Sequence, residues 1–171
     1  QAMILSTIRQ GEKIILPRNV HQSVINALVL CGGIPVYINP ETDQQLGITL
    51  GMSIVSVQNA LQSHPDAKAV LVNNPTYYGI CSDLRRITEI AHAQGMRVLV
   101  DEAHGTHFYF GSGLPLSAMA AGADMASVSL HKSGGSLTQS SLLLCGPSVN
   151  ADRVRQIINL TQTTSGSYLL L

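Results

Sequence analysis

Short, uninterrupted apolar segments separated by helix-like stretches are the feature of this sequence that most constrains its fold. Val70-Leu-Val72 and Val98-Leu-Val100 are continuous rather than alternating, as expected for strands buried on both faces of a parallel sheet. Six such strands are predicted, at residues 13–17, 34–38, 68–73, 96–101, 124–129 and 140–145. Their alternation with helical patterns is typical of an α/β domain in which helices cover the sheet.

The predicted helices are bounded by residues that commonly start or end helices. We expect helices at residues 2–10, 23–31, 53–63, 84–94 and 115–121, and a last one from Asn150 or Asp152 to 161. Gly11 would be a left-handed cap of the first helix. Ser53 and either Ser82 or Asp83 would be N-caps. Residues 39–52 and 102–114 are expected to be irregular.

Composition narrows the possible functions. With 171 residues the chain is long enough for one domain with a substantial core. The formal net charge is zero, which disfavours nucleic-acid binding because a phosphate backbone attracts a basic surface. The three cysteines, Cys31, Cys81 and Cys145, lack the spacing of a zinc site or disulfide framework. We interpret them as small buried hydrophobic residues in a reducing compartment.

The distribution of apolar residues favours a cytoplasmic protein without a membrane span. No apolar run approaches the roughly 20 residues that a spanning helix needs. No charged leader precedes the apolar residues at the start, as a signal peptide would require. A large apolar fraction of 45% suits a subunit interface. Both ends of the sequence look cut through secondary structure. We therefore expect a piece of a longer protein.

Polar side chains that could bind a ligand or take part in catalysis follow the predicted strands where those strands end. Ligands of open α/β sheets bind outside these carboxyl ends. The residues at this edge are His21, Thr76, Asp101, His104, Ser129, His131 and Lys132. Lys132 by itself can be an ordinary solvated loop residue, and Asp101 can simply cap the loop after its strand. An acid and a lysine at the ends of successive strands instead suggest a site for a cationic heterocycle held covalently.

Four segments carry a resemblance to a known family. They are Asn19-Val-His-Gln-Ser23, Pro75-Thr-Tyr-Tyr-Gly79, Val100-Asp-Glu-Ala-His-Gly105 and Ser129-Leu-His-Lys132. They resemble the major domain of the ornithine/lysine/arginine decarboxylases, in particular the shorter Gram-positive-type arginine/lysine enzymes. The similarity extends to Leu160-Thr-Gln-Thr-Thr-Ser-Gly-Ser-Tyr168. The resemblance implies a three-layer αβα fold with a mostly parallel sheet, the large domain of a fold-type I enzyme dependent on pyridoxal 5'-phosphate.

The resemblance also implies roles for the central residues. Lys132 would form the Schiff base with the cofactor, and Asp101 would pair with the pyridine nitrogen and keep it protonated. His21 would stack on one face of the ring, with the small Ala103 on the other face. Read without the family, His21 is a loop histidine with a satisfied hydrogen bond.

The remaining roles lie around the ring. Ser129 and His131 would contribute to the phosphate site, although Ser129 can also be a local cap. Thr76 would reach the phenolic oxygen of the cofactor or only hold its turn. His104 would lie near the reacting carbons. It makes an HxxH pair with His107, but without a third ligand we expect no metal site.

Departures from the family pattern mark what the chain lacks. The family often has Ser where Val20 stands and Lys where Gln22 stands. Its phosphate-binding loop would precede Gln1, at the amino end of the helix whose tail is residues 1–10, where anions are best held. A small domain would follow Leu171. Residues 1–171 would then be a partial cofactor-binding major domain, without the loop and without the small domain.

The implied activity is decarboxylation of arginine, lysine or ornithine to the amine, in polyamine-related metabolism. The substrate is a small basic amino acid, and the enzyme a homodimer or higher homo-oligomer. Two alternatives stay open. One is another fold-type I reaction, such as transamination or elimination. The other is a catalytically silent remnant or regulatory subunit that keeps the fold and a partner surface.

Overall fold

Six strands form one sheet in the computed structural model, which describes residues 1–162. Their order across the sheet is β2-β1-β5-β6-β7-β8, with β8 antiparallel to β7 and the other neighbours parallel. The bounds are β1 (Lys13–Pro17), β2 (Ile34–Ile38), β5 (Ala69–Asn73), β6 (Arg97–Asp101), β7 (Met125–Ser129) and β8 (Ser141–Cys145). The prediction of six strands in a mostly parallel sheet is confirmed.

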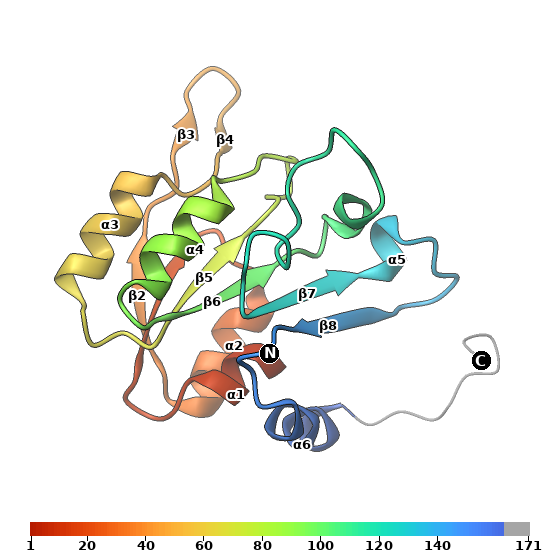
Figure 1. Cartoon of the computed structure of the whole chain (residues 1–171). Helices are drawn as coiled ribbons and strands as arrows, with labels where there is room; N and C mark the ends of the chain where they lie inside the picture. The colour runs from red at the N-terminus through yellow and green to blue at the C-terminus, as the bar shows by residue number, and fades with distance from the viewer. Residues whose placement is uncertain (163–171) are drawn as a thin grey trace.

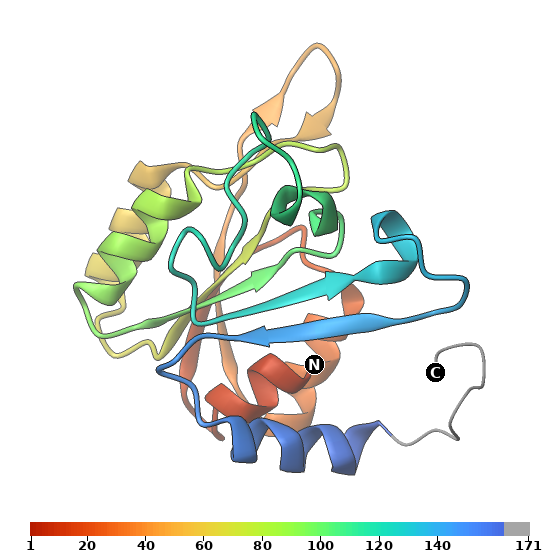
Figure 2. The same ribbon diagram turned by 45° about the vertical axis from the view of Figure 1, so that its right-hand side comes forward.

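Helices cover both faces of the sheet (Figure 1). They are α1 (Ala2–Thr7), α2 (Gln22–Cys31), α3 (Ile54–Ser63), α4 (Leu84–His92) and α6 (Ala151–Thr161). Helices α3 and α4 share one hydrophobic core with the sheet, and α1, α2 and α6 share a second core on the other side. Figure 2 shows α1 and α6 side by side on that second face. The predicted three-layer αβα arrangement is therefore confirmed.

The continuous apolar runs are explained by these two cores. In β5, Val70 and Val72 enter the core under α3 and α4, whereas Leu71 enters the core under α1 and α2. Successive side chains of a strand point to opposite faces, so a strand with helices on both sides is apolar at every position. All three side chains are at most 1% exposed.

Several predicted caps are confirmed by hydrogen bonds. Oγ of Ser53 accepts from the Ser56 N–H at 3.3 Å at the start of α3. Oδ1 of Asp83 accepts from the Arg86 N–H at 3.1 Å, so Asp83 caps α4. The Asn150 side chain caps α6 in the same way.

One predicted helix is absent. Residues 115–117 have no regular structure and residues 118–121 form a turn, not a helix. The backbone N–H of Ala118 donates to the buried carboxylate of Glu102 at 2.8 Å instead of to a helical carbonyl. A seven-residue helix is marginal on its own because nucleation is costly, so this tertiary hydrogen bond decides the local structure.

Three further segments differ from the prediction. Helix α1 ends at Thr7, and Gly11, which does have a left-handed φ of 79°, lies in the following turn. The loop at 39–52 contains a short hairpin of β3 (Thr42–Asp43) and β4 (Ile48–Thr49). Lys132 lies in a short helix, α5 (Leu130–Ser133), and a 3-10 helix, η1 (Thr106–Tyr109), interrupts the other irregular segment.

Across residues 1–162, none of the helices combines the length and apolar character needed to span a bilayer. The segment that extends the resemblance, residues 160–168, lies outside the described residues from position 163 onward.

Candidate active site

A cavity of about 810 Å³ opens at the carboxyl ends of the parallel strands. Seven of the eight predicted site residues line it: His21, Ala103, Asp101, His104, Ser129, His131 and Lys132. They come from the last residues of β6 and β7 and from the segments that follow β1, β6 and β7. The strand order changes direction between β1 and β5. This is the place where open α/β sheets bind ligands.

The floor of the cavity is a row of polar residues at matched positions of three neighbouring strands. Asn73 of β5 pairs with Asp101 of β6, and Asp101 pairs with Ser127 of β7. All three line the cavity, because residues in register on parallel strands share one face of the sheet. Oδ1 of Asp101 accepts a hydrogen bond from the Ala103 N–H at 3.2 Å. This bond orients the carboxylate and leaves Oδ2 for a cationic partner.

The amine of Lys132 lies next to an imidazole. Nζ of Lys132 is 3.2 Å from Nε2 of His104, and the ring of Tyr77 packs edge-on against His104 at 5.5 Å between centroids. Burial lowers the pKa of His104, the positive charge of Lys132 lowers it further, and Asp101 acts in the opposite direction. His104 is therefore a neutral acceptor near pH 7.

His21 is the N-cap of α2. Its Nδ1 accepts from the Ser23 N–H at 3.2 Å and lies 2.9 Å from the Ser23 hydroxyl. The Nδ1 edge of the ring therefore fits the alternative of a loop histidine whose hydrogen bond is satisfied. The cap also fixes the ring at the cavity wall, and this is compatible with the predicted stacking role.

The predicted phosphate residues lie together at the end of β7. Nδ1 of His131 lies 2.7 Å from the carbonyl oxygen of Ser140 and 3.3 Å from the Ser140 backbone nitrogen, so the Nδ1 edge faces the backbone and the Nε2 edge is left for the cavity. Ser129 occupies the N-cap position of α5, but its side chain makes no cap hydrogen bond. The alternative role of Ser129 as a local cap is therefore not seen.

Thr76 does not line the cavity. It is 2% exposed, and its hydroxyl oxygen accepts from the Ile80 N–H at 3.2 Å within the turn after β5. This arrangement favours the alternative in which Thr76 holds its turn, and its contact with a cofactor stays a prediction.

Glu102 is a residue that sequence reasoning did not single out. It is fully buried and lies in the sequence between the site residues Asp101 and Ala103. The Tyr109 hydroxyl donates to Oε2 at 2.6 Å and the Ala118 N–H donates to Oε1 at 2.8 Å. Burial raises the pKa of Glu102, and these two hydrogen bonds partly oppose the rise. The carboxylate thus braces the segment 103–118 that carries His104.

Two further cavity residues were not predicted as site residues. Tyr77 lines the cavity and is 78% exposed. Asn19 also lines the cavity and donates from Nδ2 to the Thr49 hydroxyl at 3.2 Å. Each of these residues follows the carboxyl end of a strand that borders the site, and this position in the sequence could have identified both.

No cluster of three or more metal-ligating side chains occurs among residues 1–162. His104 contacts Lys132 and Tyr77, whereas His107 packs against the ring of Phe108 at 4.7 Å between centroids.

The fold matches solved enzymes of one class. An N-succinyldiaminopimelate aminotransferase from Mycobacterium tuberculosis aligns with a TM-score of 0.69 at 22% identity, covering 94% of this chain and 42% of that one. A SepCysS–SepCysE complex aligns at 0.73 with 16% identity over 90% of this chain and 40% of that one. NtdA from Bacillus subtilis with bound cofactor PMP aligns at 0.58 with 22% identity, covering 92% and 32%. The fold is that of the large domain of fold-type I pyridoxal-phosphate enzymes.

Sequence similarity identifies the family within that class. Residues 1–171 match the family described as Orn/Lys/Arg decarboxylase, major domain, and the chain belongs to this family. An arginine decarboxylase of Halalkalibacterium halodurans is 56% identical over 170 residues, and one of Bacillus subtilis is 53% identical over 170 residues. Each alignment covers 99% of this chain. The chain spans 35% of the length of each relative.

Proposed function

We propose that the chain is the cofactor-binding portion of a pyridoxal-phosphate-dependent decarboxylase of basic amino acids. The observation that carries the proposal is the convergence of Lys132 and Asp101 on one cavity, from the ends of two neighbouring strands. Family membership supports the reaction class. Arginine is the proposed substrate, because the relatives at 53–56% identity are named arginine decarboxylases. Lysine and ornithine are the other candidates.

The side chains that line the cavity fit pyridoxal phosphate. A free carboxylate oxygen of Asp101 suits a protonated pyridine nitrogen, since a buried cation needs a paired anion. Lys132 supplies the amine for covalent attachment, and Ser129 and His131 supply polar groups on the side of the proposed phosphate. Ala103 is a small residue of the cavity wall, so it leaves room there for a ring. A cavity of about 810 Å³ is within the usual size of cofactor sites.

In the proposed reaction the cofactor accepts electrons, and the protein residues stabilise charge, hold the ring and exchange a proton. When bound, pyridoxal phosphate would accept the electron pair of the bond that breaks as the carboxylate leaves. Asp101 stabilises positive charge in the ring region through a fixed, pre-oriented carboxylate. His21 is held by its cap, so it can restrain a planar group. Nε2 of His104 lies within proton-transfer distance of Nζ of Lys132, so the pair can hold and exchange a proton at that amine.

We propose that residues 1–171 form only part of the complete site. Gln1, Ala2 and Met3 at the start of α1 line the cavity, so a preceding phosphate-binding loop would reach the site directly. The proposal of a further small domain after Leu171 is supported by the relatives, which are about three times as long as the matched region.

A homodimer or higher homo-oligomer is proposed from the exposed apolar side chains near the site. Six large ones lie in the loops that follow β5, β6 and α5: Tyr77, Tyr78, Phe110, Leu114, Leu116 and Leu137. Each of these three loops also contributes a residue to the cavity wall, and exposed apolar side chains there suit contact with a second subunit.

We further propose a cytoplasmic enzyme of polyamine-related metabolism. All three cysteines are free thiols, as expected in a reducing compartment. Their predicted burial was wrong for Cys145, which is exposed, whereas Cys31 and Cys81 are half-buried.

The proposed activity is tested with the full-length protein loaded with pyridoxal phosphate. Arginine, lysine and ornithine are supplied in parallel, and carbon dioxide and amine are both measured. We expect amine and carbon dioxide in equal amounts, with arginine turned over fastest. Lys132→Ala should lose activity by at least about a thousandfold, whereas the control Lys68→Ala, at the amino end of its strand, should keep it.

Other outcomes discriminate the alternatives. A keto acid in place of carbon dioxide would favour a transaminase. A folded protein that binds the cofactor through Lys132 but turns over none of the three amino acids would favour the silent or regulatory subunit.

A further inference from the structure

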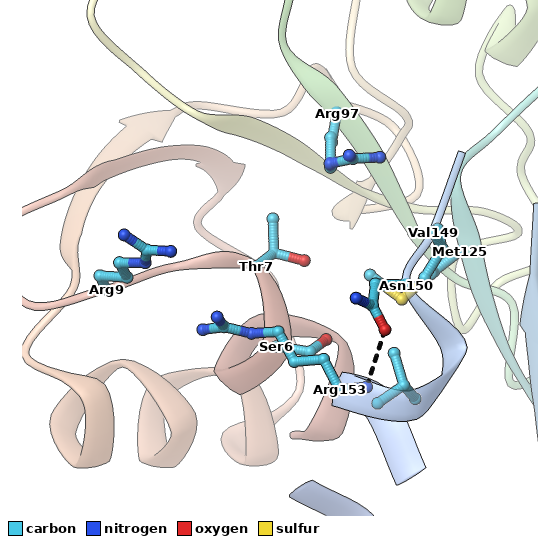
Figure 3. A pocket seen from close by; sticks show the side chains of 9 residues that line it. Ser6, Thr7, Arg9, Arg97, Met125, Val149, Asn150 and Arg153 are labelled. Carbon is cyan, nitrogen blue, oxygen red and sulfur yellow. Dashed lines mark hydrogen bonds between the residues drawn. The ribbon is translucent and has the colours of Figure 1, made fainter. Parts of the chain in front are cut away.

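A second cavity, of about 160 Å³, lies at the opposite edge of the sheet from the candidate active site. It is bounded by the end of α1, the first residues of β6 and β7, and the amino end of α6. Its walls are formed by Ser6, Thr7, Arg9, Arg97, Met125, Val149, Asn150, Arg153 and Val154 (Figure 3). Three of these nine residues are arginines, and none is acidic.

The arginines come from three separate elements. Arg9 follows α1, Arg97 begins β6 and Arg153 lies in the first turn of α6. Figure 3 shows the Arg153 side chain reaching from α6 toward α1. Arg9 and Arg153 are exposed and Arg97 is half-buried, so water screens part of the repulsion among the three positive charges, and an anion in the cavity would remove the rest.

The hydrogen bonds of the seven arginines show that the grouping is unusual within this molecule. All seven lie within residues 1–162, and five of them use the guanidinium in a hydrogen bond: Arg18, Arg85, Arg86, Arg97 and Arg155. The two whose guanidinium has no hydrogen-bond or acidic partner among the described residues are Arg9 and Arg153. Both line this cavity.

Arg97 provides a fixed point for a ligand. Its Nη1 donates to Oδ1 of Asp124 at 3.1 Å and to the Ser148 hydroxyl at 3.2 Å. These bonds use one nitrogen of a group with five N–H donors, so the remaining donors stay available while the side chain is held in place. Asp124 offsets one of the three positive charges from outside the cavity wall.

The amino end of α6 adds polar donors. Oδ1 of Asn150 accepts from the Arg153 N–H at 3.0 Å, and its amide NH₂ has no partner among the described residues. The helix has 11 residues, and its positive end favours a nearby anion. Asp152 in the same turn pairs with Arg155 at 3.4 Å and does not line the cavity.

We propose that this cavity is an oxyanion-binding site in which Arg9, Arg97 and Arg153 hold one phosphate or carboxylate group. Guanidinium groups match the geometry of these anions through paired N–H donors. The oxyanion could be a free ion or an acidic side chain from the part of the longer protein outside residues 1–171, and the chemistry of recognition is the same for both.

The test uses the full-length protein with pyridoxal phosphate bound, so that the cofactor already fills the phosphate site at the other edge of the sheet. Inorganic phosphate is titrated by calorimetry at constant ionic strength, with chloride as the balancing ion. The double variant Arg9→Gln/Arg153→Gln is compared with Arg155→Gln, which removes an arginine two positions away that does not line the cavity. Visible absorbance of the cofactor confirms that each variant is folded.

For a free anion, we expect saturable phosphate binding that is weakened at least about tenfold in the double variant and is unchanged in Arg155→Gln. For an internal carboxylate, we expect no phosphate binding, but a melting temperature lowered by several degrees more in the double variant than in Arg155→Gln. Phosphate binding that survives the double variant would overturn the proposal. So would absent binding together with equal melting temperatures.

Discussion

Nζ of Lys132 lies 3.2 Å from Nε2 of His104, although the two residues are 28 positions apart in the chain. The contact exists because β6 and β7 are neighbours and both run toward the same edge of the sheet. Each residue changes the electrostatic surroundings of the other. The site therefore has a charge balance that can be measured one residue at a time, before any ligand is added.

Substituting each charged neighbour should shift the pKa of His104 in a different direction. Lys132→Met removes a positive charge, so we expect the pKa of His104 to rise toward its ordinary value. Asp101→Asn removes the opposing negative charge, so the pKa should fall further below that value. Titration of the histidine ring by NMR in the cofactor-free protein measures both shifts. Shifts of the same sign in the two variants would contradict the electrostatic description of the site.

Glu102→Gln should weaken the brace beneath the site. Tyr109 and Ala118 each hydrogen-bond to one oxygen of Glu102, whereas a glutamine has a single oxygen and presents N–H donors to the other partner. The free energy of unfolding should fall by about 1–3 kcal/mol, because a buried donor is left without a partner. Glu89→Gln, at an exposed pair with Arg86, should change it by less than about 0.5 kcal/mol. Urea unfolding at pH 4.5 measures both.

The pH dependence of the Glu102 contribution follows from its raised pKa. A carboxyl that holds its proton more tightly in the folded state loses stabilising influence as pH rises from about 4.5, the ordinary value, through the folded pKa. The gap between wild type and Glu102→Gln should therefore be larger at pH 4.5 than at pH 7.5. A gap that widens with rising pH would show that the buried carboxylate is favoured in its charged form.

Asp124→Asn should show the opposite pH dependence. Asp124 accepts hydrogen bonds from Ser148 at 2.6 Å and from His92 and Val98 at 2.8 Å each. Although burial acts to raise the pKa of Asp124, these bonds outweigh it and lower the pKa. We expect the substitution to cost roughly 1.5–3 kcal/mol at pH 7. The wild-type advantage should be present above pH 3.8 and be lost as pH falls through the folded pKa.

The control for Asp124 is Asp152→Asn, at an ion pair in which both side chains are more than 70% exposed. Its effect on the free energy of unfolding should stay within about 0.5 kcal/mol at every pH. Equal costs for the two substitutions, measured by urea unfolding between pH 3 and pH 7, would show that the buried network around Asp124 does not stabilise the fold.

The sheet and the central site residues could be predicted because local patterns determine them. Continuous apolar runs mark strands buried on both faces, and the carboxyl ends of parallel strands meet at one edge. These two rules were enough to bring Asp101 and Lys132 together. The hairpin β3–β4 escaped prediction because each of its strands has only two residues, too few for an alternating pattern.

Features that depend on distant contacts could not be predicted. Glu102 looks like one more acid after a strand, and its role appears only when Tyr109 and Ala118 fold over it. The hydrogen bond from the Ala118 N–H to Glu102 also takes the place of the helix predicted at 115–121. The arginine-lined cavity joins positions 9, 97 and 153, and no spacing rule connects residues that far apart.

Covalent labelling tests the central claim that Lys132 binds the cofactor. The full-length protein is incubated with pyridoxal phosphate, reduced with borohydride and digested, and the modified lysine is located by mass spectrometry. We predict a single pyridoxyl group on Lys132, with Lys13 and Lys68, at the amino side of their strands, unmodified. A pyridoxyl group on another lysine, with Lys132 unmodified, would contradict the account.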